Sequence, residues 1–180
     1  MPEFAQEAGT GQVALVPAAA HETAAAVHRL LRGAGATVAT AESLTGGLIG
    51  AVLTGVAGAS ATYRGGAIAY ASDLKSGVLG VSRELLERQG AVDPDVARSM
   101  AAGVRDRLAS DFGLAVTGVA GPEPQDGRPV GLVYIAVAGP GGAQEVREFV
   151  FPGDRYQVRS STVVQALGML ADSVKAHAGK

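Results

Sequence analysis

A short polar segment, Thr40–Gly47, separates two apolar runs of the chain and restricts how they can fold. The run before it, residues 36–39, is rich in Ala, Thr and Val and predicts a short buried strand. The run after it, residues 48–53, predicts a helix. The polar segment is therefore expected to be a tight turn at the carboxyl edge of a sheet, where its glycines let backbone N–H groups approach an anion.

Ser43 lies in this turn and is a candidate nucleophile. The amides of Gly46 and Gly47, or those of the glycine-rich turn that begins at Gly118, are candidate donors to the oxyanion that would form when Ser43 attacks a carbonyl. The simpler interpretation is that Ser43 or Thr45 only caps the following helix by accepting hydrogen bonds from its unpaired amides. The turn alone leaves both interpretations open.

Polar residues also follow two other predicted strands. The strand over Tyr63–Ala71, which we expect to be buried, runs into Ser72 and Asp73. The strand over Phe112–Thr117 ends in a second glycine-rich turn, Gly118–Gly121. Because the carboxyl ends of parallel strands meet at one edge of a sheet, we expect these groups to lie near one another. The groups expected there are Ser43, Thr45, Tyr70, Ser72, Asp73, Lys75 and Thr117, with the amides of Gly46, Gly47, Gly118 and Gly121.

Lys75 is the candidate base in this set, because a serine activated by a neutral lysine fits the residues available. The histidines, His21, His28 and His177, lie near the chain ends, which argues against a Ser-His-Asp arrangement. Lys75 and Tyr70 have simpler interpretations too, as a solvated helix residue and as a core residue with a satisfied hydroxyl.

The remaining segments predict a three-layer α/β/α sandwich with a mixed sheet. One domain is expected over residues 20–180, preceded by a flexible arm over residues 1–19. The near-continuous apolar run Val130–Ala138 predicts a central strand buried on both faces. The other expected elements are helices over Glu22–Ala34, Ser82–Gln89 and Asp93–Ser110, a hairpin strand over Gln144–Phe151, and a last helix from an Asp154/Gln157 capping box to Lys175.

Composition argues against several classes of function. The net charge is −2 and the 15 Lys and Arg residues are dispersed, which gives no support to nucleic-acid binding. We expect no membrane association and a cytoplasmic location, because the N-terminus has no signal-like pattern and no apolar run is long enough to span a bilayer. No metal site is expected, because Cys is absent and His21 and His28 lie two helical turns apart, where we expect solvated surface.

A series of sequence blocks, in order over about residues 22–176, resembles the CinA carboxy-terminal domain family. The blocks are residues 41–47 (AESLTGG), 69–75 (AYASDLK), 78–81 (VLGV), 90–92 (GAV), 115–122 (AVTGVAGP), 129–133 (PVGLV) and 151–155 (FPGDR). This resemblance implies a hydrolase that converts nicotinamide mononucleotide to nicotinate mononucleotide with release of ammonia. It places the catalytic roles on Ser43, Tyr70 and Lys75, and it implies no metal or organic cofactor.

The chain departs from the family pattern at two positions: Leu44 stands where Cys is frequent, and Asp73 where Asn is frequent. The acid is the more serious departure, because its negative charge would lie beside Lys75. An alternative function is therefore a non-catalytic nucleotide-binding or regulatory module with a link to competence or DNA damage. Longer relatives carry a further N-terminal domain that resembles molybdopterin-binding proteins, and we expect no room for it here.

The remaining expectations concern the substrate and the base. The partner is expected to be a small mononucleotide, with Arg155 or Arg159 holding its phosphate, and the chain to form a homo-oligomer. For Lys75 to act as a base its pKa must be lowered. We expect Asp73 to face away from Lys75, or Tyr70 to stand between them, with its hydroxyl bonded to Lys75 or relaying the proton.

Overall fold

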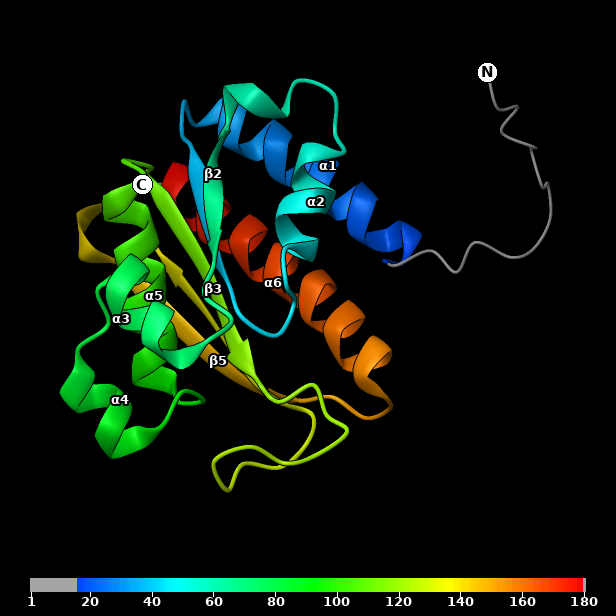
Figure 1. Ribbon diagram of the computed structural model, residues 1–180. Coiled ribbons are helices and arrows are strands. Elements are labelled where there is room, and N and C mark those ends of the chain that lie inside the picture. Colours follow the sequence, from blue (N-terminus) through cyan, green and yellow to red (C-terminus); the bar gives the residue numbers. More distant parts are fainter. Residues whose placement is uncertain (1–15, 180) are drawn as a thin grey trace, which may run out of the picture.

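The computed structural model describes residues 16–179, which form a five-stranded sheet between two layers of helices (Figure 1). The strands are β1 (Val38–Glu42), β2 (Tyr63–Ile68), β3 (Phe112–Gly118), β4 (Leu132–Ala138) and β5 (Gln144–Val150). Their order in the sheet is β2-β1-β3-β4-β5. The first three are parallel, whereas β4 and β5 pair antiparallel as a hairpin. The predicted three-layer sandwich with a mixed sheet is confirmed.

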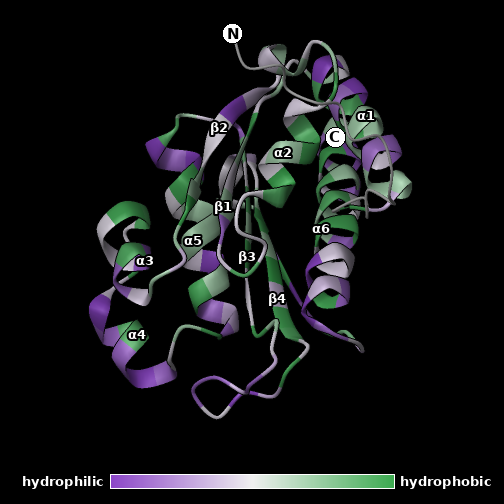
Figure 2. Cartoon of the chain, turned by 45° about the vertical axis from the view of Figure 1, so that its right-hand side comes forward, coloured by the Kyte–Doolittle hydropathy of each residue, from purple (hydrophilic) through white to green (hydrophobic). Residues whose placement is uncertain are grey.

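The helices divide between the two faces of the sheet (Figure 2). One face carries α1 (Ala18–Gly33), α2 (Leu48–Thr54) and α6 (Arg155–Ala178); the other carries α3 (Ser72–Leu79), α4 (Arg83–Gln89) and α5 (Pro94–Arg107). Short 3₁₀ helices cover Ala59–Ala61 and Pro140–Gly142. Most of the arm predicted over residues 1–19 lies outside the described residues, and α1 already includes Ala18 and Ala19.

Alternating side chains of the strands feed two apolar cores. In β1, Val38 packs into the core under α1, α2 and α6, whereas Ala39 and Ala41 pack into the core under α3, α4 and α5. Strands β3 and β4 are buried along their whole length, as predicted for β4. Small side chains let the layers approach closely: a Cβ added at Gly113 would lie 2.0 Å from the Ala101 carbonyl of α5.

The helix starts follow the predicted local signals. Ser82 caps α4 by accepting from the Leu85 amide, and Asp93 caps α5 by accepting from the Asp95 amide. Asp154 and Gln157 form the predicted capping box at the start of α6.

Three local predictions need correction. β1 extends to Glu42 and α2 begins only at Leu48, so the turn is shorter and starts at Ser43 itself. β2 is not a buried strand but an edge strand with alternately exposed positions, because within residues 16–179 only β1 pairs with it. His28 is not solvated: it is fully buried, with Nδ1 2.5 Å from Thr62 Oγ1 and Nε2 3.0 Å from the Leu53 carbonyl.

Candidate active site

Ser43 and Lys75 meet at the carboxyl edge of the parallel strands. Ser43 is the first residue after β1, and Lys75 lies in the first turns of α3, which follows β2. The Lys75 ammonium donates to Ser43 Oγ at 3.0 Å and to the Ala69 carbonyl at 2.9 Å. Lys75 is 1% exposed and Ser43 9% exposed, so water is largely excluded from the pair.

Burial changes the acid–base properties of Lys75. Desolvation disfavours the charged ammonium and lowers the pKa of Lys75 from an ordinary 10.5 to about 8. Near neutral pH a substantial minority of the molecules then carry a neutral amine, which is the form that can accept a proton from a serine hydroxyl. Position and pKa are both those that a serine–lysine pair requires.

Ser43 and Lys75 line a polar pocket of about 100 Å³. Among the residues predicted to form the site, the pocket brings together Ser43, Tyr70, Ser72, Lys75, Thr117, Gly118, Gly121 and Arg155. Thr117 is held in place because its hydroxyl donates to the Ala91 carbonyl at 2.7 Å.

Tyr70 forms the rim of the pocket and not its interior. Its side chain is 58% exposed, and its hydroxyl accepts from Arg155 Nη2 at 2.7 Å. Arg155 Nη1 also donates to the Gly121 carbonyl at 2.9 Å. Of the two expected arrangements, the structure has the one in which Asp73 faces away from Lys75. The Tyr70 hydroxyl bonds to Arg155 and not to Lys75, and it joins a bridge across the mouth of the pocket.

Five predicted site residues do not line the pocket: Thr45, Gly46, Gly47, Asp73 and Arg159. Asp73 is exposed while Lys75 is buried, as expected for an acid that faces away from the base. Thr45 is fully buried, and its hydroxyl has no hydrogen-bond partner in the part of the chain that the structure describes. Arg159 donates to the carbonyls of Leu44 and Thr45.

The amides of Gly46 and Gly47 are already occupied, which corrects their predicted role as oxyanion donors. The Gly46 N–H donates to the Ser43 carbonyl at 3.0 Å. The Gly47 N–H donates to Glu42 Oε2, which also accepts from Ile49, and Glu42 Oε1 accepts from Gly50. The buried Glu42 carboxylate thus caps α2 and fills its anion-binding end.

Sequence reasoning missed several functional neighbours. Glu42 was treated only as part of the turn, although it is the residue that satisfies the α2 amides. Glu123 and Gln125 line the pocket from the loop after β3, and neither is among the residues predicted to form the site. Their position directly after the Gly118–Gly121 turn was the signal that could have pointed to them.

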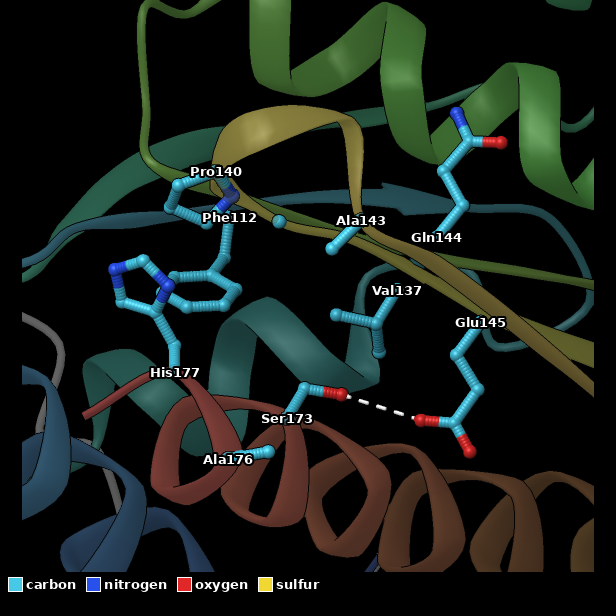
Figure 3. Close-up of a pocket in the computed structure, with 10 residues that line it drawn as sticks. Phe112, Val137, Pro140, Ala143, Gln144, Glu145, Ser173, Ala176 and His177 are labelled. Carbon is cyan, nitrogen blue, oxygen red and sulfur yellow. Dashed lines mark hydrogen bonds between the residues drawn. The ribbon is translucent and has the colours of Figure 1, made fainter. Parts of the chain in front are cut away.

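A larger pocket, of about 190 Å³, lies at the opposite end of the sheet, beside the first residue of β3 and the end of α6 (Figure 3). Phe112 and His177 meet edge to face on one side of it. On the other side Ser173 donates to Glu145, which also pairs with Arg147. None of the predicted site residues lines this pocket.

Within residues 16–179, no group of three or more His, Cys, Asp or Glu side chains is arranged to hold a metal ion. None of the helices in the same range is both long and apolar enough to cross a bilayer.

The fold and the pocket define a class of protein: a three-layer α/β/α domain with a buried serine–lysine pair at the carboxyl edge of its sheet. The chain belongs to the CinA family, since residues 20–174 match the CinA C-terminal domain. A CinA-like protein of Frankia casuarinae is 51% identical over 135 residues, which cover 75% of this chain and 31% of that protein. A putative competence-damage inducible protein of Desulforamulus reducens is 51% identical over 143 residues, which cover 79% of this chain and 34% of that protein. The chain thus spans about a third of the length of these relatives.

Solved structures resemble the chain over nearly their whole length. The competence/damage inducible protein CihA from Agrobacterium tumefaciens superposes with a TM-score of 0.85 at 38% identity, covering 91% of this chain and 99% of that one. A CinA superfamily protein from Klebsiella pneumoniae gives a TM-score of 0.84 at 32% identity, and the match covers 87% of this chain and 98% of that one.

Proposed function

We propose that the chain is an amidohydrolase that converts nicotinamide mononucleotide to nicotinate mononucleotide and ammonia through Ser43 and Lys75. The observation that carries the proposal is the 3.0 Å contact between the Lys75 amine and Ser43 Oγ, in surroundings that lower the pKa of Lys75 to about 8. The resemblance of the sequence blocks to the family of deamidases supplies the substrate.

The reaction proceeds in two stages. Neutral Lys75 takes the Ser43 proton as Oγ attacks the carboxamide carbon, and the resulting ammonium returns a proton to the nitrogen when the C–N bond breaks and ammonia leaves. Water then attacks the acyl ester on Ser43, with Lys75 as base, and releases the carboxylate and the serine. Each proton that Lys75 accepts is given back, so the amine is neutral again at the end of the cycle.

The size of the pocket suggests how a mononucleotide would bind. At about 100 Å³ the pocket is smaller than the roughly 300–1,000 Å³ typical of sites that enclose a whole drug-sized ligand. The pyridine carboxamide would enter it, and the ribose phosphate would lie along the rim. Arg155 is the cation on that rim, and it is the candidate for the phosphate.

Asp73 does not count against this proposal. The acid is exposed and is absent from the pocket lining, and burial is the cause of the lowered pKa of Lys75. No residue of the pocket favours the alternative of a non-catalytic regulatory module over an amidase.

The proposal is tested by measuring ammonia and nicotinate mononucleotide released by the purified protein. Ser43→Ala should fold normally and lose turnover, whereas the matched variant Ser60→Ala, at an exposed serine outside the pocket, should retain it. If the wild type binds the substrate in calorimetry but releases no ammonia, the chain is a binding module. If Ser43→Ala keeps near-normal turnover, the serine only serves the turn.

A further inference from the structure

The Ser43 turn is held by a residue from the last helix. Arg159 lies in the second turn of α6 and donates from Nε to the Leu44 carbonyl at 3.0 Å and from Nη2 to the Thr45 carbonyl at 2.8 Å. Its side chain is half-buried and does not line the pocket. Arg159 is therefore bound to the backbone of the turn, in contrast to Arg155, which lies on the rim.

Two backbone amides in the same turn are buried and unpaired. Leu44 is 4% exposed and Thr45 fully buried, yet neither N–H has an acceptor anywhere in residues 16–179. Buried amides without an acceptor are rare in folded proteins, and two in succession require an explanation. Leu44 directly follows the nucleophile and lines the pocket, and in other serine hydrolases the amide at this position donates to the oxyanion.

The direction of the Leu44 amide is fixed through the carbonyls of the turn. A peptide unit is planar and trans, so its N–H points opposite to its C=O. Arg159 holds the Thr45 carbonyl and thereby sets the direction of the Gly46 N–H. The Gly46 N–H holds the Ser43 carbonyl and sets the direction of the Leu44 N–H. The Leu44 N–H cannot turn toward another acceptor without breaking one of these bonds.

We propose that the Leu44 amide donates to the oxyanion of the tetrahedral intermediate on Ser43, and that Arg159 is the positioning residue that holds the turn carrying this amide. The inference rests on the proposed function, since an acyl-transfer step is what produces the oxyanion. It replaces two expectations: the Gly46 and Gly47 amides as oxyanion donors, since both are occupied, and the phosphate role of Arg159.

Steady-state kinetics separates positioning from phosphate binding. In Arg159→Ala, the Thr45 carbonyl loses its donor and the turn that fixes the Leu44 amide is free to rearrange. We expect kcat to fall about 100-fold, as for loss of one oxyanion donor, with KM changed less than about threefold. A phosphate ligand would give the opposite result, a raised KM with kcat intact. Gln165→Ala, an exposed change on the same helix, is the control for effects on α6. Arg159→Lys keeps the charge but cannot donate to both carbonyls at once as the guanidinium does, so we expect it to lose most of the same activity. If Arg159→Ala does not fold, the kcat of Arg159→Lys tests the positioning role instead.

Labelling with a fluorophosphonate tests the inference without the substrate. Ser43 Oγ attacks phosphorus, fluoride leaves, the proton passes to Lys75, and the phosphoryl oxygen occupies the place of the oxyanion. We expect Ser43 labelling to slow about 100-fold in Arg159→Ala, in step with kcat. An equal labelling rate in wild type and folded Arg159→Ala overturns the inference. If Ser43 of the wild type is labelled but the protein releases no ammonia from nicotinamide mononucleotide, the proposed substrate is wrong. The labelling rates of wild type and Arg159→Ala still test the role of Arg159 in that case.

Discussion

Replacing Lys75 by Met tests whether burial lowers the pKa of Lys75 in the folded protein. Met keeps a long unbranched side chain without the charge. The folded protein holds the Lys75 proton with a pKa of about 8, against an ordinary 10.5 in the unfolded chain. Between these two values the unfolded chain keeps a proton that the folded chain has released, so the free energy of unfolding rises with pH.

The size of the effect follows from the two pKa values. At about 1.4 kcal/mol per pH unit, burying the charged amine costs the folded state about 3 kcal/mol at pH 7, and most of this cost disappears by pH 10. The stability of wild type relative to Lys75→Met should therefore increase by about 2.5 kcal/mol from pH 7 to pH 10. The lost hydrogen bonds to Ser43 and Ala69 are a constant difference between the two proteins and do not contribute to this change.

The assay is urea denaturation of both proteins at several pH values between 7 and 10. Tyr63 and Tyr134 have raised pKa values and titrate in both proteins, so the subtraction removes them. A difference that stays constant within about 0.5 kcal/mol over this range refutes the argument. Lys75 would then lack the perturbed pKa, and the pocket would hold no neutral base near pH 7.

Three further predictions concern the base, the rim and the packing. Lys75→Arg should fold but be inactive, and wild-type kcat should fall as pH drops below about 8, because protonation removes the base; a flat profile to about pH 5 with chemistry rate-limiting contradicts this. Arg155→Ala should raise KM about tenfold, or about 1.4 kcal/mol, with kcat little changed; an unchanged KM leaves the phosphate with another group. Gly113→Ala should destabilise the fold by about 1–3 kcal/mol in chemical denaturation, because its Cβ would meet the Ala101 carbonyl; Gly168→Ala, with open space around its Cβ inside α6, should instead be neutral or stabilising by up to about 1 kcal/mol.

Much of the architecture could be predicted because its signals are local. Strand and helix periodicity gave the order of the elements, and the caps at Ser82, Asp93 and Asp154 lie within a few residues of the amides that they satisfy. The pairing of Ser43 with Lys75 was also accessible, because both follow parallel strands and such strands present their ends at one edge of the sheet.

The hydrogen-bond partners of individual side chains could not be predicted from such local signals. Glu42 belongs by sequence to the polar turn, yet only the path of the chain into α2 brings its carboxylate onto the Gly47, Ile49 and Gly50 amides. β2 has the composition of a buried strand, but it lies at the edge of the sheet that the described residues form. Its exposure follows from this position, which its own residues do not encode.

By itself, the sequence determined the layers, the helix starts and the strand-end position of the reactive serine and lysine, because each depends on residues close together in the chain. Only the tertiary structure decided what surrounds them. Arg159 reaches the Ser43 turn across 115 positions of sequence, and Tyr70 meets Arg155 across 85. The physical reason is that hydrophobic patterning fixes which face of an element is buried, whereas the donor that meets a given carbonyl depends on how separate layers pack against one another.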